Sequence, residues 1–83
     1  MTEKNKNPPN MPKVNDRIRI THDKLVIETT IRFMAIYPNG VVIIHPDSEI
    51  VRELIFGDEK WEGQIYSEIE KLSELLTFTV EVI

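Results

Sequence analysis

The sequence predicts a small α+β domain, with a three-stranded antiparallel meander followed by one or two helices and a C-terminal strand (β-β-β-α(-α)-β). Two observations carry this prediction. Apolar and polar residues alternate, as in half-buried strands, over residues 13–21 and again over residues 77–83. Between these regions, apolar residues recur at helical spacing. A chain of 83 residues suffices for one domain, which we place at residues 13–83.

Residues 1–12 predict a flexible N-terminal tail. They contain three prolines, and their only large apolar side chains are two methionines. Such a stretch buries too little apolar surface to offset the entropy lost on ordering.

The first two strands, about residues 13–21 and 24–37, predict a hairpin that turns at His22 and Asp23. Pairing the strands around this turn places apolar residues opposite apolar ones on one face and matches polar residues on the other. Asp16 is a misfit on the apolar face. The predicted partners are Ile20 with Leu25, Ile18 with Ile27, Val14 with Ile31, Arg17 with Glu28, and Asn15 with Thr30.

A second hairpin leads to a third strand at residues 41–45, after the sequence Pro38-Asn39-Gly40. A two-residue loop at Asn39 and Gly40 would put Pro38 in the ladder, where it lacks an N–H donor. A type I turn followed by a left-handed Gly40 suits all three residues, and we prefer it. It pairs Tyr37 with Val41, Ala35 with Ile43, and Phe33 with His45. The third strand is apolar on both faces and tolerates either register.

Residues 48–56 favour a helix capped by Asp47 or Ser48 and stopped at Gly57, with a short strand as the alternative. The next helix is predicted from Trp61 to Leu75, although Gly63 weakens its first turn. Its apolar stripe comprises Trp61, Ile65, Ile69, Leu72 and Leu76. The last strand covers residues 77–83. We expect it to join the edge of the first strand in parallel, with the opposite sheet edge as the alternative.

Composition argues against several classes of function. The chain has no cysteine, which excludes disulfides, thiolate chemistry and cysteine-based zinc sites and fits a reducing compartment. Its two histidines, His22 and His45, lack the spacing of a metal site or a catalytic pair. The polar N-terminus does not resemble a secretory signal, and no apolar run is long enough to span a membrane. We therefore expect a cytoplasmic protein that is not an enzyme and carries no metal or cofactor.

Charge divides unevenly along the chain. Residues 1–45 carry seven cations and four anions, whereas residues 46–83 carry three cations and ten anions, for a net charge of −4. Together with an apolar second sheet face, which Val42 and Ile44 join, this favours a regulator, inhibitor or accessory subunit that binds a protein partner or itself. The predicted partner-binding residues are Val26, Met34, Ile36, Asp58, Glu59, Trp61 and Glu62. For Trp61, core packing is the competing interpretation.

Nucleic-acid binding is the alternative function. Basic residues share the outward face of the first hairpin, where phosphate groups could be contacted. They are Lys13, Arg17, Arg19 and Arg32. The stretch Val14–Ile20 resembles the first strand of SH3-like barrels, some of which bind nucleic acid. Because the predicted helices do not suit that fold, we do not assign the family.

Overall fold

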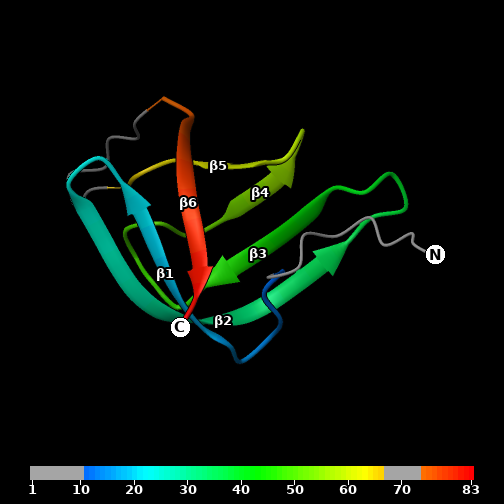
Figure 1. The fold of residues 1–83 in the computed structure, drawn as a ribbon, viewed down its shortest axis with the longest axis horizontal. Coiled ribbons are helices and arrows are strands. Elements are labelled where there is room, and N and C mark those ends of the chain that lie inside the picture. Colours follow the sequence, from blue (N-terminus) through cyan, green and yellow to red (C-terminus); the bar gives the residue numbers. More distant parts are fainter. Residues whose placement is uncertain (1–10, 67–73) are drawn as a thin grey trace.

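In the computed structural model, which describes residues 11–66 and 74–83, the chain is all-β over these residues (Figure 1). Six antiparallel strands follow one another in chain order around a closed barrel. They are β1 (Arg17–His22), β2 (Leu25–Ile36), β3 (Val42–Pro46), β4 (Leu54–Gly57), β5 (Lys60–Gly63) and β6 (Leu76–Val82). The predicted α+β fold is therefore wrong, and the chain is a small β-barrel.

The helix favoured over residues 48–56 is replaced by a turn and a strand. The Ser48 hydroxyl does accept hydrogen bonds from the Ile50 and Val51 amides, at 3.1 and 3.3 Å, as a helix cap would. No helix follows, because the segment ends in β4, whose residues pair with both β3 and β5. A cap can close a single turn as well as begin a helix, so Ser48 does not discriminate between the two.

The second predicted helix is wrong over its first turn, where Lys60–Gly63 forms β5. The remainder of that prediction falls partly on residues 67–73, which lie outside the described residues. β4 and β5 are joined by Asp58 and Glu59, whose φ angles of 54° and 64° suit a two-residue hairpin turn. The apolar residues of this region therefore follow the two-residue period of strands.

Two sheets make up the barrel, and both long strands are shared between them. The first sheet consists of β1 with the Leu25–Thr30 half of β2 and the Thr79–Val82 half of β6. The second sheet consists of β3, β4 and β5 with the remaining halves of β2 and β6. Figure 1 shows β2 curving between the two sheets.

A β-bulge at Arg32 marks the point where β2 changes sheet. Ile31 lies opposite Pro46 and Phe33 lies opposite His45, so two steps along β2 match one step along β3. The extra residue reverses the alternation of side chains along the strand. Ile31 is buried in the core, whereas Phe33 is 54% exposed.

The first hairpin is present, but its register differs from the predicted one by two residues. Its turn lies at Asp23 and Lys24, so Ile20 pairs with Ile27 and Arg19, not Arg17, pairs with Glu28. A shift of two residues keeps each side chain on its predicted face. The positive φ of Asp23, 54°, suits the first position of this two-residue turn.

Asp16 precedes β1, so it is not an exception to the apolar face of that strand. Its carboxylate accepts a hydrogen bond from the Lys13 amide at 2.9 Å, and its own amide donates to the Lys13 carbonyl at 3.0 Å. The amide of Ile31, on β2, donates to the Asp16 carbonyl. The loop before β1 therefore pairs with β2 at the point where β2 continues into the second sheet.

The preferred geometry of the second hairpin is confirmed. Gly40 has φ of 94°, and its amide donates to the Tyr37 carbonyl at 2.9 Å, which closes a turn over Pro38 and Asn39. Ala35 pairs with Ile43 and Phe33 with His45, while the Tyr37 amide donates to the Val41 carbonyl.

The core consists of apolar rows that cross the barrel from strand to strand. One row of the second sheet contains Val42, Phe56, Trp61 and Phe78, and the next contains Ile44, Leu54, Gly63 and Leu76. Gly63 allows two backbones to approach, since a Cβ there would lie 2.7 Å from the Glu53 carbonyl oxygen and 2.9 Å from Leu54 Cδ2. The first sheet contributes Ile18 and Ile20, both fully buried.

The C-terminal strand is confirmed as β6, but it runs antiparallel to β1 and pairs also with β5, which closes the barrel. Of the predicted tail only Met11 and Pro12 are described. Met11 packs against the core and Pro12 is fully buried. Within residues 11–66 and 74–83 there is no helix that could cross a membrane.

Candidate binding surface

The outer face of the second sheet is apolar across three neighbouring strands. Ala35, Ile43 and Ile55 lie side by side on β2, β3 and β4, because each is the ladder partner of the next. Phe33 and His45 form the adjacent pair, with ring centroids 5.3 Å apart. Phe33 is 54% exposed and Ile55 is 38% exposed. We call these five residues the apolar face.

Glu62 borders the apolar face on β5, opposite Ile55. Lys60 lies on the same strand, and its ammonium group is 3.7 Å from the Glu62 carboxylate. Next to them, Asp58 and Glu59 are exposed in the turn between β4 and β5. The apolar face therefore has an acidic margin on its β5 side.

An open pocket of about 340 Å³ lies at the other corner of the apolar face. Two arginines, a histidine and a phenylalanine contribute to its walls. The lining residues are Arg32, Phe33, His45, Pro46, Ser48 and Arg52.

The two arginines of the pocket are held differently. Arg52 lies over the Tyr66 ring at 4.2 Å, and its Nε donates to the Glu49 carbonyl at 3.3 Å. Arg32 is 3.6 Å from the Asp47 carboxylate, with both side chains largely exposed. Among the described residues no carboxylate forms an ion pair with Arg52.

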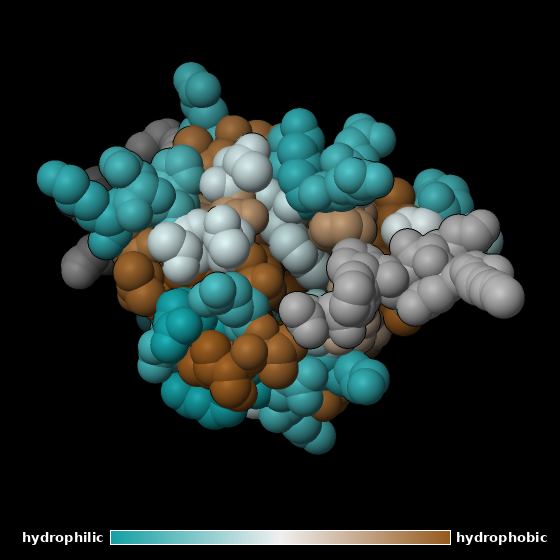
Figure 2. All heavy atoms as spheres, viewed as in Figure 1, coloured by the Kyte–Doolittle hydropathy of each residue, from teal (hydrophilic) through white to brown (hydrophobic). Residues whose placement is uncertain are grey.

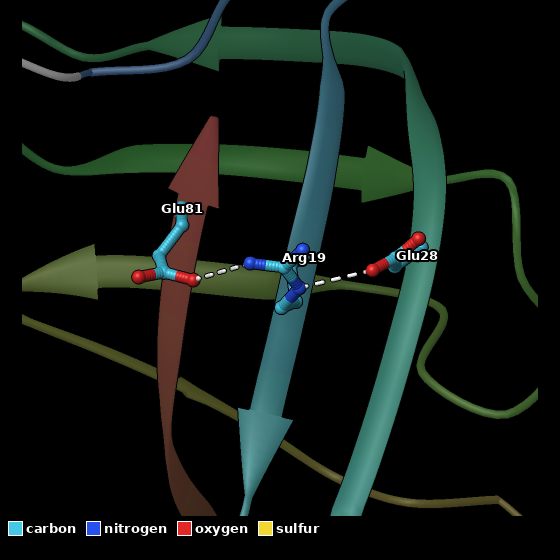
Figure 3. Close-up of polar contacts among 3 residues, drawn as sticks. All are labelled: Arg19, Glu28 and Glu81. Atoms are coloured by element: carbon cyan, nitrogen blue, oxygen red, sulfur yellow. Dashed lines mark hydrogen bonds and ion pairs between the residues drawn. The ribbon is translucent and has the colours of Figure 1, made fainter. Parts of the chain in front are cut away.

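The outer face of the first sheet is polar instead (Figure 3). Arg19 on β1 lies between Glu28 on β2 and Glu81 on β6, with nitrogen–oxygen distances of 3.0 and 3.2 Å. The hydrogen bond to Glu28, followed by that to Glu81, raises the pKa of Arg19 above its ordinary value. Thr21 and Thr79 form the next cross-strand pair. Figure 2 shows hydrophilic side chains over much of the face seen in that view, with apolar atoms gathered near the C-terminal end of β6.

The predicted partner-binding residues do not form one surface. Val26 is 55% exposed on the outer face of the first sheet, opposite Thr21, and Ile36 is 61% exposed near the end of β2. Met34 instead packs against the core, together with the fully buried Val42 and Ile44. The sheet face that we expected to meet a partner is therefore largely the interior of the barrel, because the bulge turns this part of β2 over.

The other predicted partner-binding residues lie around β5. Trp61 is 7% exposed and packs beside Phe56, with ring centroids 4.9 Å apart, which places it in the core. Asp58, Glu59 and Glu62 remain accessible, but on a hairpin. The acidic helical half expected to carry these residues is not present over Asp58–Gly63.

The four residues of the predicted nucleic-acid site have different environments. Arg17 and Arg19 lie on the outer face of the first sheet, where Arg19 is bound by two carboxylates. Lys13 lies in the loop that Asp16 closes, and Arg32 lines the pocket of the second sheet.

Within the part of the chain that the structure describes, each histidine contacts an aromatic ring. His22 Nδ1 donates to the Thr77 carbonyl at 2.9 Å, where β6 leaves β1 for β5, and its ring packs against Phe78. His45 contacts Phe33. Among the described residues, no three histidines or carboxylates are grouped so that they could hold a metal ion.

Sequence analysis did not identify the apolar face or the Arg52 part of the pocket. Phe33, Ile43 and Ile55 were assigned by alternation to other faces or to a helix. The available signal was the polar Arg32 between Ile31 and Phe33, which fits a bulge but is not specific to one. No protein-family model, curated protein or solved structure was found to match this chain.

Proposed function

We propose that this protein is a non-enzymatic binding module that docks another protein chain on its apolar face. The observation that carries the proposal is the contrast between two exteriors of one barrel. The outer face of the first sheet combines an ion-paired arginine and threonines with the exposed Val26, whereas Phe33, Ile43 and Ile55 lie together on the outer face of the second sheet. Contiguous exposed apolar side chains characterise surfaces that bind partners.

The margins of the apolar face define the chemistry of the partner. Asp58, Glu59 and Glu62 lie toward β5, and Arg32 and Arg52 lie toward the pocket. A partner that presents apolar side chains between a basic group and an acidic group would match both margins. We also propose a cytoplasmic location, which the absence of cysteine supports.

A pair of matched variants tests the docking face. Ile43→Thr with Ile55→Thr keeps β-branched side chains but adds hydroxyl groups to the apolar face. Val26→Thr makes the same kind of change on the outer face of the first sheet, where Val26 is 55% exposed. All proteins are first compared by thermal unfolding, so that loss of binding is not confused with loss of fold.

Pull-down from the source lysate then gives the readout. We expect the wild type and Val26→Thr to retain the same protein and the double variant to lose it. Retention by all three proteins would overturn the proposed docking face. A wild-type dimer in light scattering that the double variant dissociates would identify the occupant as a second copy, and would overturn the proposal of a different partner.

Nucleic-acid binding through the first hairpin has less support. Arg19 is already bound by Glu28 and Glu81, so a phosphate would have to displace two carboxylates. The net charge of −4 also opposes association with a polyanion.

A further inference from the structure

We propose that the pocket at the corner of the apolar face binds a single oxyanion, a carboxylate or a phosphate group, that the protein partner carries beside an apolar or aromatic side chain. This inference rests on the proposed function, because it assigns a chemical group to the docked partner. Two arginines and the exposed Phe33 line the pocket, and these are the residue types that such a group requires.

Arg52 is the principal anion ligand in this proposal. Stacking on Tyr66 and the hydrogen bond to the Glu49 carbonyl restrain its side chain. The Tyr66 amide donates to the Ile50 carbonyl at 2.8 Å, which fixes Tyr66 against the same loop. A restrained guanidinium loses less side-chain entropy when it binds an oxyanion, and it can present two N–H donors at once.

Arg32 provides the second cation. Its contact with Asp47 is long, at 3.6 Å, and both side chains are more than half exposed. Exposed ion pairs of this kind contribute little to stability. An incoming oxyanion can therefore share or replace Asp47 as the counterion of Arg32.

The ring pair determines what accompanies the anion. Phe33 and His45 line the pocket and also belong to the apolar face, so the two sites are continuous. A partner segment that crosses Ile55 and Ile43 reaches Phe33 and then the two arginines. An anionic residue next to an apolar or aromatic one fits this order of contacts.

Local charge favours one oxyanion over a polyanion. The loop that carries Arg52 also carries Asp47, Glu49 and Glu53, all exposed. A chain of phosphates running past the pocket would meet all three carboxylates, whereas a single group between the arginines competes mainly with Asp47 for Arg32. The pocket therefore suits an acidic or phosphorylated peptide better than a nucleic acid.

Small probes test the pocket without the partner. Phenyl phosphate and 3-phenylpropionate each combine a ring with one oxyanion, and benzyl alcohol has the ring alone. In an NMR titration we expect both anions, but not the alcohol, to shift the amides of Arg32, Phe33, His45 and Arg52. Charge-assisted hydrogen bonds contribute enough that Arg52→Gln should weaken binding roughly tenfold. Arg17→Gln removes a cation from the other sheet and should change the affinity less than about twofold.

Three outcomes would overturn the proposal. They are amide shifts confined to another surface, equal affinity in the wild type and Arg52→Gln, and binding of benzyl alcohol as strong as that of the anions. A fourth outcome would show that the partner is a nucleic acid and not a protein. If a ten-residue oligothymidylate bound more tightly than phenyl phosphate and weakened steeply with salt, the ligand would be a nucleic acid.

The pocket and the docking face can fail separately. Probe binding that depends on Arg52 supports the pocket whatever the pull-down shows. If Ile43→Thr with Ile55→Thr retains its partner, the docking face fails and the pocket result stands.

Discussion

The two sheets of this barrel are alike inside and different outside. Each contributes fully buried aliphatic residues to one core, such as Ile18 and Ile20 from the first sheet and Val42 and Ile44 from the second. Outside, the first sheet carries the Glu28–Arg19–Glu81 ion pairs and the second carries Phe33, Ile43 and Ile55. Because the core requires only the inward positions to be apolar, packing of the core does not explain why the two outer faces differ in composition.

The largest effect is expected at Gly63, where the inner row of the second sheet has no room for a side chain. Gly63→Ala would place a Cβ 2.7 Å from a backbone oxygen, so the strands must separate. We expect this to lower the free energy of unfolding by about 1–3 kcal/mol, the range for overpacked cores. Urea unfolding measures the change.

Gly57→Ala is the matched control, because nothing lies within 4 Å of a Cβ at Gly57 and its φ is not positive. Its stability should stay within about 0.5 kcal/mol of the wild type, or rise slightly. Equal losses in both variants would mean that β5 is not held against β4 as described.

A smaller effect is expected at Thr29, which joins the two sheets. Its hydroxyl donates to the Asp47 carbonyl at 2.7 Å, and Thr29 is 8% exposed. Thr29→Val keeps the shape but leaves that carbonyl without this donor, at a cost of about 1 kcal/mol. Thr79→Val, at an exposed position of β6, should be nearly neutral. If the two variants unfold at the same urea concentration, the junction does not depend on this bond.

The smallest effect is expected on the polar exterior. Arg19→Gln removes both ion pairs of an exposed group, so the thermal midpoint should fall only slightly, and less at 1 M salt than at low salt. The raised pKa of Arg19 means that these pairs are present below its ordinary pKa and are lost only as pH rises through the raised value. Titration of Arg19 therefore does not change the free energy of unfolding between pH 6 and pH 9. A change of stability in that pH range that disappears in Arg19→Gln would contradict this account.

Alternation predicted the strands of the first sheet well, and turn chemistry predicted the second hairpin. Pro38, Asn39 and Gly40 each have a backbone preference that only one turn satisfies, and that turn is present. The first hairpin had no such turn residues. Its pattern allowed registers two residues apart, and an aspartate with positive φ selected between them.

The second half of the chain was harder to predict, because its strands are short. β4 and β5 each have four residues, too few for the two-residue period to be distinguished from helical spacing. Trp61 fits a helical stripe as well as a strand. Gly63 was interpreted as a defect in a helix, whereas it marks the close approach of two strands.

The candidate binding surface could not be predicted because it depends on the bulge. A single extra residue at Arg32 exchanges the inner and outer faces of β2, and Met34, Val42 and Ile44 then face the core. The sequence shows that β2 and β3 carry more apolar residues than one face of the sheet needs. The pairing of β2 with β3 decides which of these residues lie outside the barrel.

The bulge also separates two kinds of change that this chain can accept. Beyond Arg32, adjacent positions on β2 and β3 belong alternately to the core and to the apolar face. Outward residues can therefore be exchanged one by one while their inward neighbours keep the barrel closed. In evolutionary or engineering terms, the outward side chains can vary on a constant scaffold, and beyond Arg32 the odd-numbered positions of β2 carry those outward side chains.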